Sequence, residues 1–275
     1  MFPVVRVGVD VTGFGSYADP ALVADVAHAA EEAGWDALFI WDHLAWVEGI
    51  PSGDPWISLA AAATATRRIR LGLGVTPLPR RRPQIVATAV TALDRLSGGR
   101  IIFGAGLGGT AAEFEAFGEI AEPRLRAAKL DEGLDLLDRL WRGDLVSHRG
   151  EHYTVAGLRL APLPLQRPRP PVWIGGSATP ALRRAASWDG YAVGSIVDEQ
   201  GNVVVEPSEV ARRVRAIGRD DPSFDVAVVG VSEPGHAGIR HDYAAAGATW
   251  WLESIHDLRG TPQAMLDRVR AGPGD

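Results

Sequence analysis

Cysteine is absent from this 275-residue sequence, which excludes disulfide bridges and catalysis by a thiolate. Long apolar runs are absent too, because none approaches the roughly 18 residues that a membrane-spanning helix requires. The opening residues, MFPVVRVGVD, lack the basic segment and the following apolar segment of a secretory leader. The lack of a leader and of a spanning segment predicts a cytoplasmic protein with no membrane partner.

Basic residues are fewer than acidic residues in this sequence. The chain carries 28 Lys and Arg against 34 Asp and Glu, which gives a formal net charge of -6. This balance offers no electrostatic case for binding nucleic acid or an anionic membrane. Apolar residues make up 46% of the chain, enough for a sizeable core, and the 23% that are charged is ordinary for a globular protein.

The strongest structural pattern lies in residues 68–110. An apolar strand is expected at Ile69–Val75, followed by a proline-initiated helix at Pro83–Leu96. A second apolar strand, Ile101–Ala105, then opens into a glycine-rich loop. Two strands that are apolar throughout and are connected by a crossover helix form parallel pairs in a sheet. This stretch therefore predicts an α/β fold.

The same alternation of strand and helix runs along the whole chain. It is interrupted at about 143–171, where a β-hairpin pattern is followed by a proline-rich segment. Eight strand–helix pairs in 275 residues predict a single (β/α)8 TIM-barrel domain over residues 1–275, whereas a doubly wound open sheet would have fewer strands. The strands are expected at Val4–Val9, Ala37–Trp41, Ile69–Val75, Ile101–Ala105, Val172–Gly175, Tyr191–Val193, Val226–Val231 and Thr249–Leu252.

Chemistry in such a barrel belongs at the carboxyl ends of the strands. These ends combine titratable groups, large aromatic side chains and glycine loops, a set that suits a planar heteroaromatic ring at the barrel mouth. The residues there are Asp10, the run Trp41-Asp42-His43 with Trp46, Thr76, Gly104 and Gly106 with Glu113, the run Gly175-Gly176-Ser177, Gly194 with Ser195, Glu233 with His236, and Glu253 with His256.

His43 is the first candidate for catalysis. An imidazole exchanges protons near neutral pH, and the adjacent Asp42 could raise its pKa or fix its tautomer. The alternative is a structural histidine satisfied by the backbone, with Asp42 capping the next turn. Glu113 could act as an acid beside the ring, or it could be a solvated carboxylate favoured by a helix dipole.

Two glycine-rich turns are candidates for holding a cofactor. Gly104 to Gly109 formally satisfies GxGxxG, but that motif alone is weak evidence for a dinucleotide site. We interpret this loop instead as a place where backbone approaches a cofactor closely. The run Gly175-Gly176-Ser177 precedes a helix and could bind a phosphate through its amides, with Gly194-Ser195 completing the site. A tight turn without a ligand is the alternative there.

Four side chains are candidates for the substrate pocket, namely Trp41, Trp46, Trp251 and Glu253. For Trp46 and Trp251, packing in the core or at an interface is an equally good interpretation. Adjacent strand residues face opposite sides, so only one of Trp250 and Trp251 can point into the barrel.

Several separate motifs carry a family resemblance. The run GVTPLPRRRP…LDRLSGGRIIFGAGLGG, with AEEAGWDALFIWDHL before it and PVWIGG…RRAASWDGY after it, resembles the bacterial luciferase-like family of flavin- and deazaflavin-dependent oxidoreductases. The resemblance covers most of the first two hundred residues. It implies an enzyme that uses either reduced FMN with dioxygen, as a monooxygenase, or coenzyme F-420 in hydride transfer to or from a small organic substrate.

The resemblance also implies roles for particular residues and partners. The Asp42-His43 pair would lie beside the reactive face of the ring. Gly74 and Val75, followed by Thr76, would form a bulge with a non-prolyl cis peptide that supports the ring. A homodimer and a separate flavin reductase are further expectations.

Two other functions stay open from the residues themselves. One is a divalent-metal barrel that uses the carboxylates and histidines at the strand ends, although no close pair of ligands is present and we expect no metal. The other is a flavin-binding protein without catalytic turnover.

Overall fold

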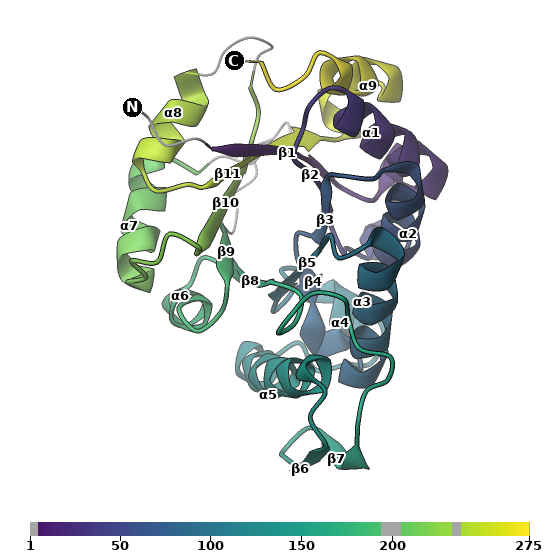
Figure 1. The fold of residues 1–275 in the computed structure, drawn as a ribbon, viewed down its shortest axis with the longest axis vertical. Helices are drawn as coiled ribbons and strands as arrows, with labels where there is room; N and C mark the ends of the chain where they lie inside the picture. Colours follow the sequence, from purple (N-terminus) through teal and green to yellow (C-terminus); the bar gives the residue numbers. More distant parts are fainter. Residues whose placement is uncertain (1–4, 194–204, 233–237, 275) are drawn as a thin grey trace.

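The computed structural model describes residues 5–193, 205–232 and 238–274. Its parallel strands form a closed barrel, because the pairing of β3 with β5 completes the ring. Helices surround this barrel, which confirms the predicted TIM-barrel fold (Figure 1). The barrel strands are β1 (Arg6–Val11), β2 (Ala37–Ile40), β3 (Arg70–Leu73), β5 (Ile101–Gly106), β8 (Val172–Gly176), β9 (Gly190–Val193), β10 (Asp225–Gly230) and β11 (Trp250–Ile255).

The third barrel strand is interrupted by the bulge and the cis peptide that the family resemblance implies, although its apolar pattern predicts a continuous strand. The sequence pattern favoured one strand over Ile69–Val75, but β3 ends at Leu73 and a two-residue strand, β4 (Thr76–Pro77), continues its course. Leu71 pairs with Ile101 and Thr76 pairs with Ala105, so the third strand contains one residue more than β5 between these pairs. A bulge therefore lies at Gly74–Val75, whose peptide bond is cis.

Four of the helices described below, α1, α2, α5 and α9, begin with proline after a residue whose side chain caps the helix. Asp54 accepts hydrogen bonds from the amides of Trp56 and Ile57, and Asp19 accepts one from Ala21. The helices are α1 (Pro20–Glu32), α2 (Pro55–Ala65), α3 (Pro83–Ser97), the short α4 (Ala112–Glu115), α5 (Pro123–Arg142), α6 (Thr179–Ala185), α7 (Pro207–Ile217), α8 (Gly238–Ala245) and α9 (Pro262–Arg270).

A plug of aromatic side chains fills the barrel interior. Phe39 stacks on Trp173 with ring centroids 5.0 Å apart, and Trp250 lies edge-on to both rings. The other members of this inner cluster are Ala37, Ile102, Ala227 and Leu252. The plug closes the barrel beneath the strand ends, so a ligand has room only at the mouth.

The predicted excursion at about 143–171 leaves the barrel beside α5. Its antiparallel strands, β6 (Val146–Arg149) and β7 (Thr154–Leu158), lie at the bottom of Figure 1. Glu132 on α5 holds this hairpin by accepting hydrogen bonds from the amides of His152 and Tyr153, at 2.9 and 2.8 Å. Asp94 holds the proline-rich segment, because its carboxylate accepts from the amide of Leu165 at 2.7 Å.

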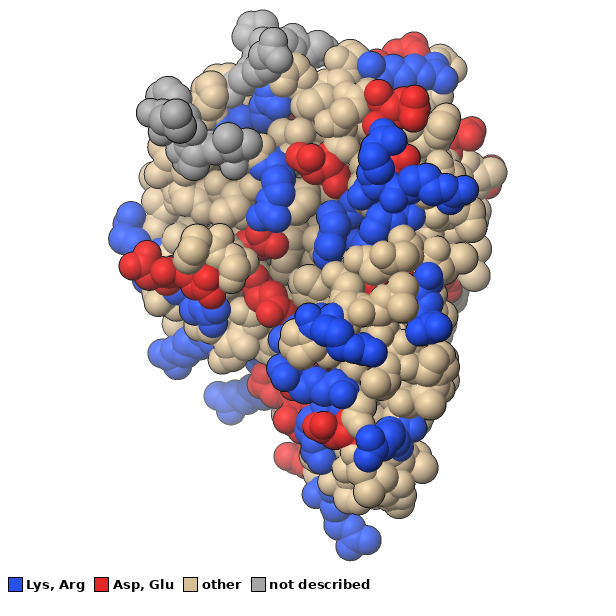
Figure 2. All heavy atoms as spheres, viewed as in Figure 1, with Lys and Arg blue, Asp and Glu red and all other residues tan. Residues whose placement is uncertain are grey.

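On the face that Figure 2 shows, acidic and basic side chains are interspersed over the surface. Among the described residues, no helix has the length and apolar character needed to cross a membrane.

Candidate active site

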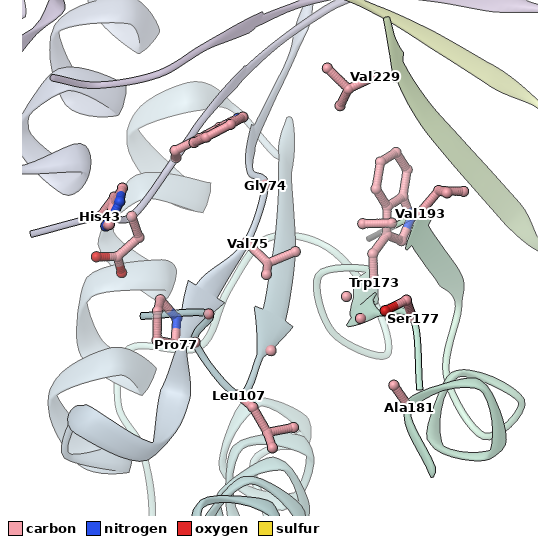
Figure 3. A pocket seen from close by; sticks show the side chains of 18 of the residues that line it. His43, Gly74, Val75, Pro77, Leu107, Trp173, Ser177, Ala181, Val193 and Val229 are labelled. Carbon is pink, nitrogen blue, oxygen red and sulfur yellow. The ribbon is translucent and has the colours of Figure 1, made fainter. Parts of the chain in front are cut away.

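A cavity of about 560 Å³ lies at the carboxyl ends of the barrel strands (Figure 3). Its volume falls within the range of roughly 300 to 1,000 Å³ that small-molecule and cofactor sites occupy. Figure 3 shows His43 on one side of the pocket and Trp173, Val193 and Ser177 across from it. The strand ends that predict chemistry in a TIM barrel thus converge on one concave site.

His43, Glu113 and Arg80 form a chain of ion pairs at this pocket. Nδ1 of His43 contacts Oε1 of Glu113, and Oε2 of Glu113 contacts a guanidinium nitrogen of Arg80. The Glu113 and Arg80 side chains are buried, whereas the His43 side chain is 23% exposed and lines the pocket. A carboxylate at Nδ1 fixes the ring orientation and leaves Nε2 as the nitrogen that can exchange a proton with a ligand.

Asp42 does not orient His43 in the way that the sequence suggested. Its carboxylate accepts hydrogen bonds from Arg80 at 2.6 Å and from Arg81 at 2.7 and 2.8 Å. Consecutive residues leaving a strand point in different directions, so Asp42 turns to the arginines while His43 faces the cavity. The carboxylate that orients the imidazole is Glu113.

Arg80 is the member of this network that sequence reasoning missed. Arg80 begins the run Arg80-Arg81-Arg82, which the sequence analysis did not select as a site. Its position directly after the third strand was the available signal, because strand ends carry the chemistry of a barrel. Burial lowers the pKa of the Arg80 guanidinium, and the charge of Asp42 opposes that shift.

Three of the predicted cofactor-binding glycines make room for the side chain of Val75. A Cβ atom on Gly106 would lie 2.8 Å from a Val75 methyl group, and one on Gly175 would lie 2.9 Å from the same group. A Cβ on Gly104 would collide with the carbonyl oxygen of Leu73. The bulge at Gly74–Val75 therefore occupies the space that these glycines leave, and Val75 becomes part of the pocket wall.

Asp10 is a buried acid in the same wall. Its Oδ2 accepts a hydrogen bond from Nε1 of Trp41 at 2.5 Å, while Oδ1 has no partner. Burial raises the pKa of Asp10 to about 8, a shift that the Trp41 hydrogen bond partly offsets. Burial therefore favours the neutral form of this carboxyl group over its carboxylate.

The pocket brings together most of the predicted site residues. Gly74, Val75, Gly106, Gly175, Gly176, Ser177 and Trp41 line it with Asp42, His43 and Glu113. Floor residues that the sequence reasoning did not name are Phe39, Trp173, Val229 and Leu252. The alternation of strand residues was the signal that could have found them.

Other predicted residues lie outside the pocket lining or the described chain. Thr76 is fully buried in β4, and the half-exposed Trp46 packs on Phe117 with ring centroids 5.1 Å apart. Trp251 and Glu253 face away from the barrel interior, because the inward positions of β11 are those of Trp250 and Leu252. Gly194 and Ser195 fall outside the described residues.

Glu253 is part of a buried polar network behind β11. Its carboxylate accepts hydrogen bonds from the backbone amide and the hydroxyl of Ser232 and from Arg259. Nowhere in the described ranges, this network included, do three His, Asp or Glu side chains gather in a group that could hold a metal ion.

Comparison with known proteins places this architecture in a family. A family model described as luciferase-like monooxygenase matches residues 4–249. An F-420-dependent glucose-6-phosphate dehydrogenase of Nakamurella multipartita is 36% identical over 171 residues, which are 60% of this chain and 49% of the relative. A dehydrogenase of the same description from Gordonia bronchialis is 32% identical over 180 residues, 63% of this chain and 52% of that protein. The chain thus spans about half the length of the curated relatives it matches.

Solved structures share the fold over almost the whole chain. The coenzyme F-420-dependent tetrahydromethanopterin reductase of Methanopyrus kandleri superposes with a TM-score of 0.73 at 17% identity and covers 98% of each chain. A monooxygenase from Streptomyces bottropensis superposes with a TM-score of 0.72 at 20% identity, covering 97% of this chain and 98% of its own.

Proposed function

Because this chain belongs to the luciferase-like monooxygenase family, we propose that it is an oxidoreductase that binds coenzyme F-420 at the barrel mouth. The observation that carries this proposal is the His43–Glu113 pair at the cavity wall. The curated relatives in Nakamurella and Gordonia bear the name of an F-420-dependent dehydrogenase, which supports this choice of cofactor.

The residues present fit a flat cofactor. Val75 offers an apolar surface from the bulge, and the orphaned Oδ1 of Asp10 offers a polar partner in the same wall. Gly175, Gly176 and Ser177 line the opposite side, where their backbone would hold a phosphate group. When bound, F-420 would supply the chemistry of hydride transfer.

His43 would handle the proton that accompanies this transfer. Oxidation of an alcohol releases a hydroxyl proton, and an imidazole whose Nδ1 is held by a carboxylate can accept it at Nε2. Glu113 would hold the imidazole in place, and Arg80 would hold the Glu113 carboxylate through their ion pair.

The charge of the pocket points to an uncharged substrate. None of the described lining residues is Lys or Arg. The segments outside the described ranges contain neither residue type. With the backbone of Gly175 to Ser177 assigned to the cofactor, a phosphate-bearing substrate, such as the one in the relatives' name, would find no cationic side chain of Lys or Arg to pair with. We propose a small uncharged alcohol or carbonyl compound instead.

The test is a fluorescence titration with F-420, FMN and reduced FMN, followed by an assay of hydride transfer with uncharged alcohols and with glucose 6-phosphate. We expect F-420 to bind and an uncharged alcohol to react. The change His43→Asn should lower the rate constant by about 100-fold or more while the affinity for F-420 changes little. Absence of binding by all three cofactors, or an unimpaired variant, would overturn the proposal.

Reduced FMN is the second candidate cofactor. The floor of the pocket is apolar, with Phe39, Trp173, Val229 and Leu252 around it. Such a water-poor site suits the reaction of reduced FMN with dioxygen that the family resemblance implies for a monooxygenase. A separate reductase would then supply the reduced flavin. Oxygen consumption that depends on reduced FMN and on an added organic substrate would favour this function over hydride transfer.

A further inference from the structure

Asp10 occupies an inward position near the end of β1. It pairs in register with Phe39 of β2 on one side and with Ser254 of β11 on the other. The residue is 1% exposed, yet it lines the cavity. Its neighbours in the wall, Phe39 and Leu252, are apolar, so the carboxyl group is the polar feature of this part of the site.

The two oxygens of Asp10 have different surroundings. Oδ2 is engaged by the indole nitrogen of Trp41 at 2.5 Å. Oδ1 has no hydrogen-bond partner and lies 3.5 Å from the position that a Cβ on Gly74 would take. Buried polar atoms usually have a hydrogen-bond partner, so an unpartnered carboxyl oxygen of a residue that lines a cavity is a candidate for a bond to a ligand. The adjacent bulge at Gly74–Val75 supplies the apolar surface for a ring at the same place.

The charged groups near Asp10 are already paired or face elsewhere. After β2, Asp42 is held by Arg80 and Arg81, and His43 pairs with Glu113. On β11, Glu253 faces outward and pairs with Arg259, and the buried His256 follows the strand. Phe39 and Gly74 complete the surroundings without charge. No neighbouring charge contributes to the raised pKa of Asp10, whose main cause is burial.

We propose that Asp10 is a neutral carboxylic acid in the folded protein and that its Oδ1–H donates a hydrogen bond to an acceptor atom of the cofactor ring. This inference rests on the proposed function, because it assigns a partner within the same site. Asp10 would thus help to position the ring against the bulge. Loss of its proton would turn the donor into a carboxylate that repels the acceptor.

The test is a series of F-420 and FMN titrations from about pH 6 to about pH 10, in the unchanged protein and three variants. Asp10→Leu keeps the approximate shape but has no donor, and we expect it to weaken binding about tenfold at pH 7. Asp10→Asn keeps a donor that cannot ionise, and we expect near-normal binding at pH 7. Ser254→Ala is the matched control, since Ser254 is an equally buried neighbour with an unpartnered hydroxyl outside the pocket lining.

The pH dependence distinguishes a hydrogen-bond donor from a structural group. Above the pKa of Asp10, which burial raises to about 8, the dissociation constant of the unchanged protein should rise by up to about tenfold per pH unit. Asp10→Asn should remove this rise, whereas Ser254→Ala should retain it. Equal affinities and equal pH profiles for the unchanged protein and both Asp10 variants would overturn the proposal.

Infrared spectroscopy separates a failure of the proposed function from a failure of the role proposed for Asp10. Infrared difference spectra of the cofactor-free protein minus Asp10→Asn should show the carbonyl band of a protonated carboxyl group at pH 7, and this band should disappear as the pH rises past about 8. A protein that shows this band but binds none of the cofactors would contradict the proposed function. A protein that binds F-420 or FMN without showing the band would contradict the role of Asp10.

Discussion

At the scale of single residues, the site depends on carboxylates that are buried with their partners. Asp42 is engaged by both Arg80 and Arg81, and Glu113 lies between Arg80 and His43. Such a network fixes the position of each member, because removing one partner leaves a buried charge uncompensated. The imidazole of His43 is therefore held in one orientation before any ligand arrives.

The change Asp42→Asn tests this network. It removes the carboxylate that Arg80 and Arg81 share, and Arg80 keeps its contact with Glu113. Because two buried or half-buried guanidinium groups lose this partner, we expect the free energy of unfolding to fall by about 3 kcal/mol. Chemical denaturation measures the loss. The control is Asp135→Asn, because Asp135 is largely exposed and makes a single 3.5 Å contact with Arg139. The control should change stability by less than about 0.5 kcal/mol, and an equal effect of both changes would contradict the account.

Asp10 predicts an unusual dependence of stability on pH. Its pKa is 3.8 in a model peptide and about 8 in the folded protein. Between these values the unfolded chain releases the proton that the folded protein keeps, so stability falls as the pH rises and levels off above about 8. Relative to Asp10→Asn, the unchanged protein should lose up to about 1.4 kcal/mol per pH unit in this window. Denaturation curves at several pH values measure the difference, and parallel pH profiles for the two proteins would contradict the assignment.

Some of these residues could be found from the sequence and others could not. The position of His43 and Glu113 after strands was enough to place them near one ligand. The partner of His43 was not predictable, because whether Asp42 or Glu113 reaches the imidazole depends on how the loops after β2 and β5 turn. The role of Arg80 depends on the same loop geometry.

At the scale of elements, the bulge between β3 and β4 shapes the pocket. The apolar pattern of Ile69–Val75 predicts one continuous strand, and nothing in that pattern marks the extra residue. Gly104, Gly106 and Gly175 were instead attributed to contact with the cofactor. The structure shows a different use for their missing side chains, since they make space for Leu73 and Val75.

Two alanine substitutions, one in β5 and one in the loop that follows it, test whether the glycines make space for the bulge. Gly104→Ala would place a methyl group against the carbonyl oxygen of Leu73, so we expect it to destabilise the protein by about 2 kcal/mol or more. Gly109→Ala is the matched control, because no atom lies within 4 Å of a Cβ there. Thermal or chemical denaturation measures both. A destabilisation of Gly109→Ala as large as that of Gly104→Ala would show that the crowding at the bulge is not the cause.

The last barrel strand shows a second limit of the sequence pattern. Trp250 and Trp251 are both large and apolar, so either could point into the barrel. The pairing of Val9 with Glu253 and of Asp10 with Ser254 decides the matter, because it sets which alternate residues face inward. Trp251 and Glu253 consequently pack behind the strand.

At the scale of the whole molecule, closure of the barrel is what assembles the site. The tips of strands that are far apart in the sequence meet at one rim, and the aromatic plug beneath them limits the depth of the cavity. The rhythm of strand and helix made this architecture predictable, including the excursion that carries β6 and β7. We propose that residues 1–275 form a single domain around this barrel.

Hydrogen–deuterium exchange with and without F-420 tests the central claim that one flat cofactor lies on this rim. We predict slower exchange at 41–43, 74–77, 106–113 and 175–178 when F-420 is bound, with no change in the hairpin at 146–158, which lies away from the pocket. Protection confined to the hairpin, or protection of only one of the four rim segments, would contradict the account.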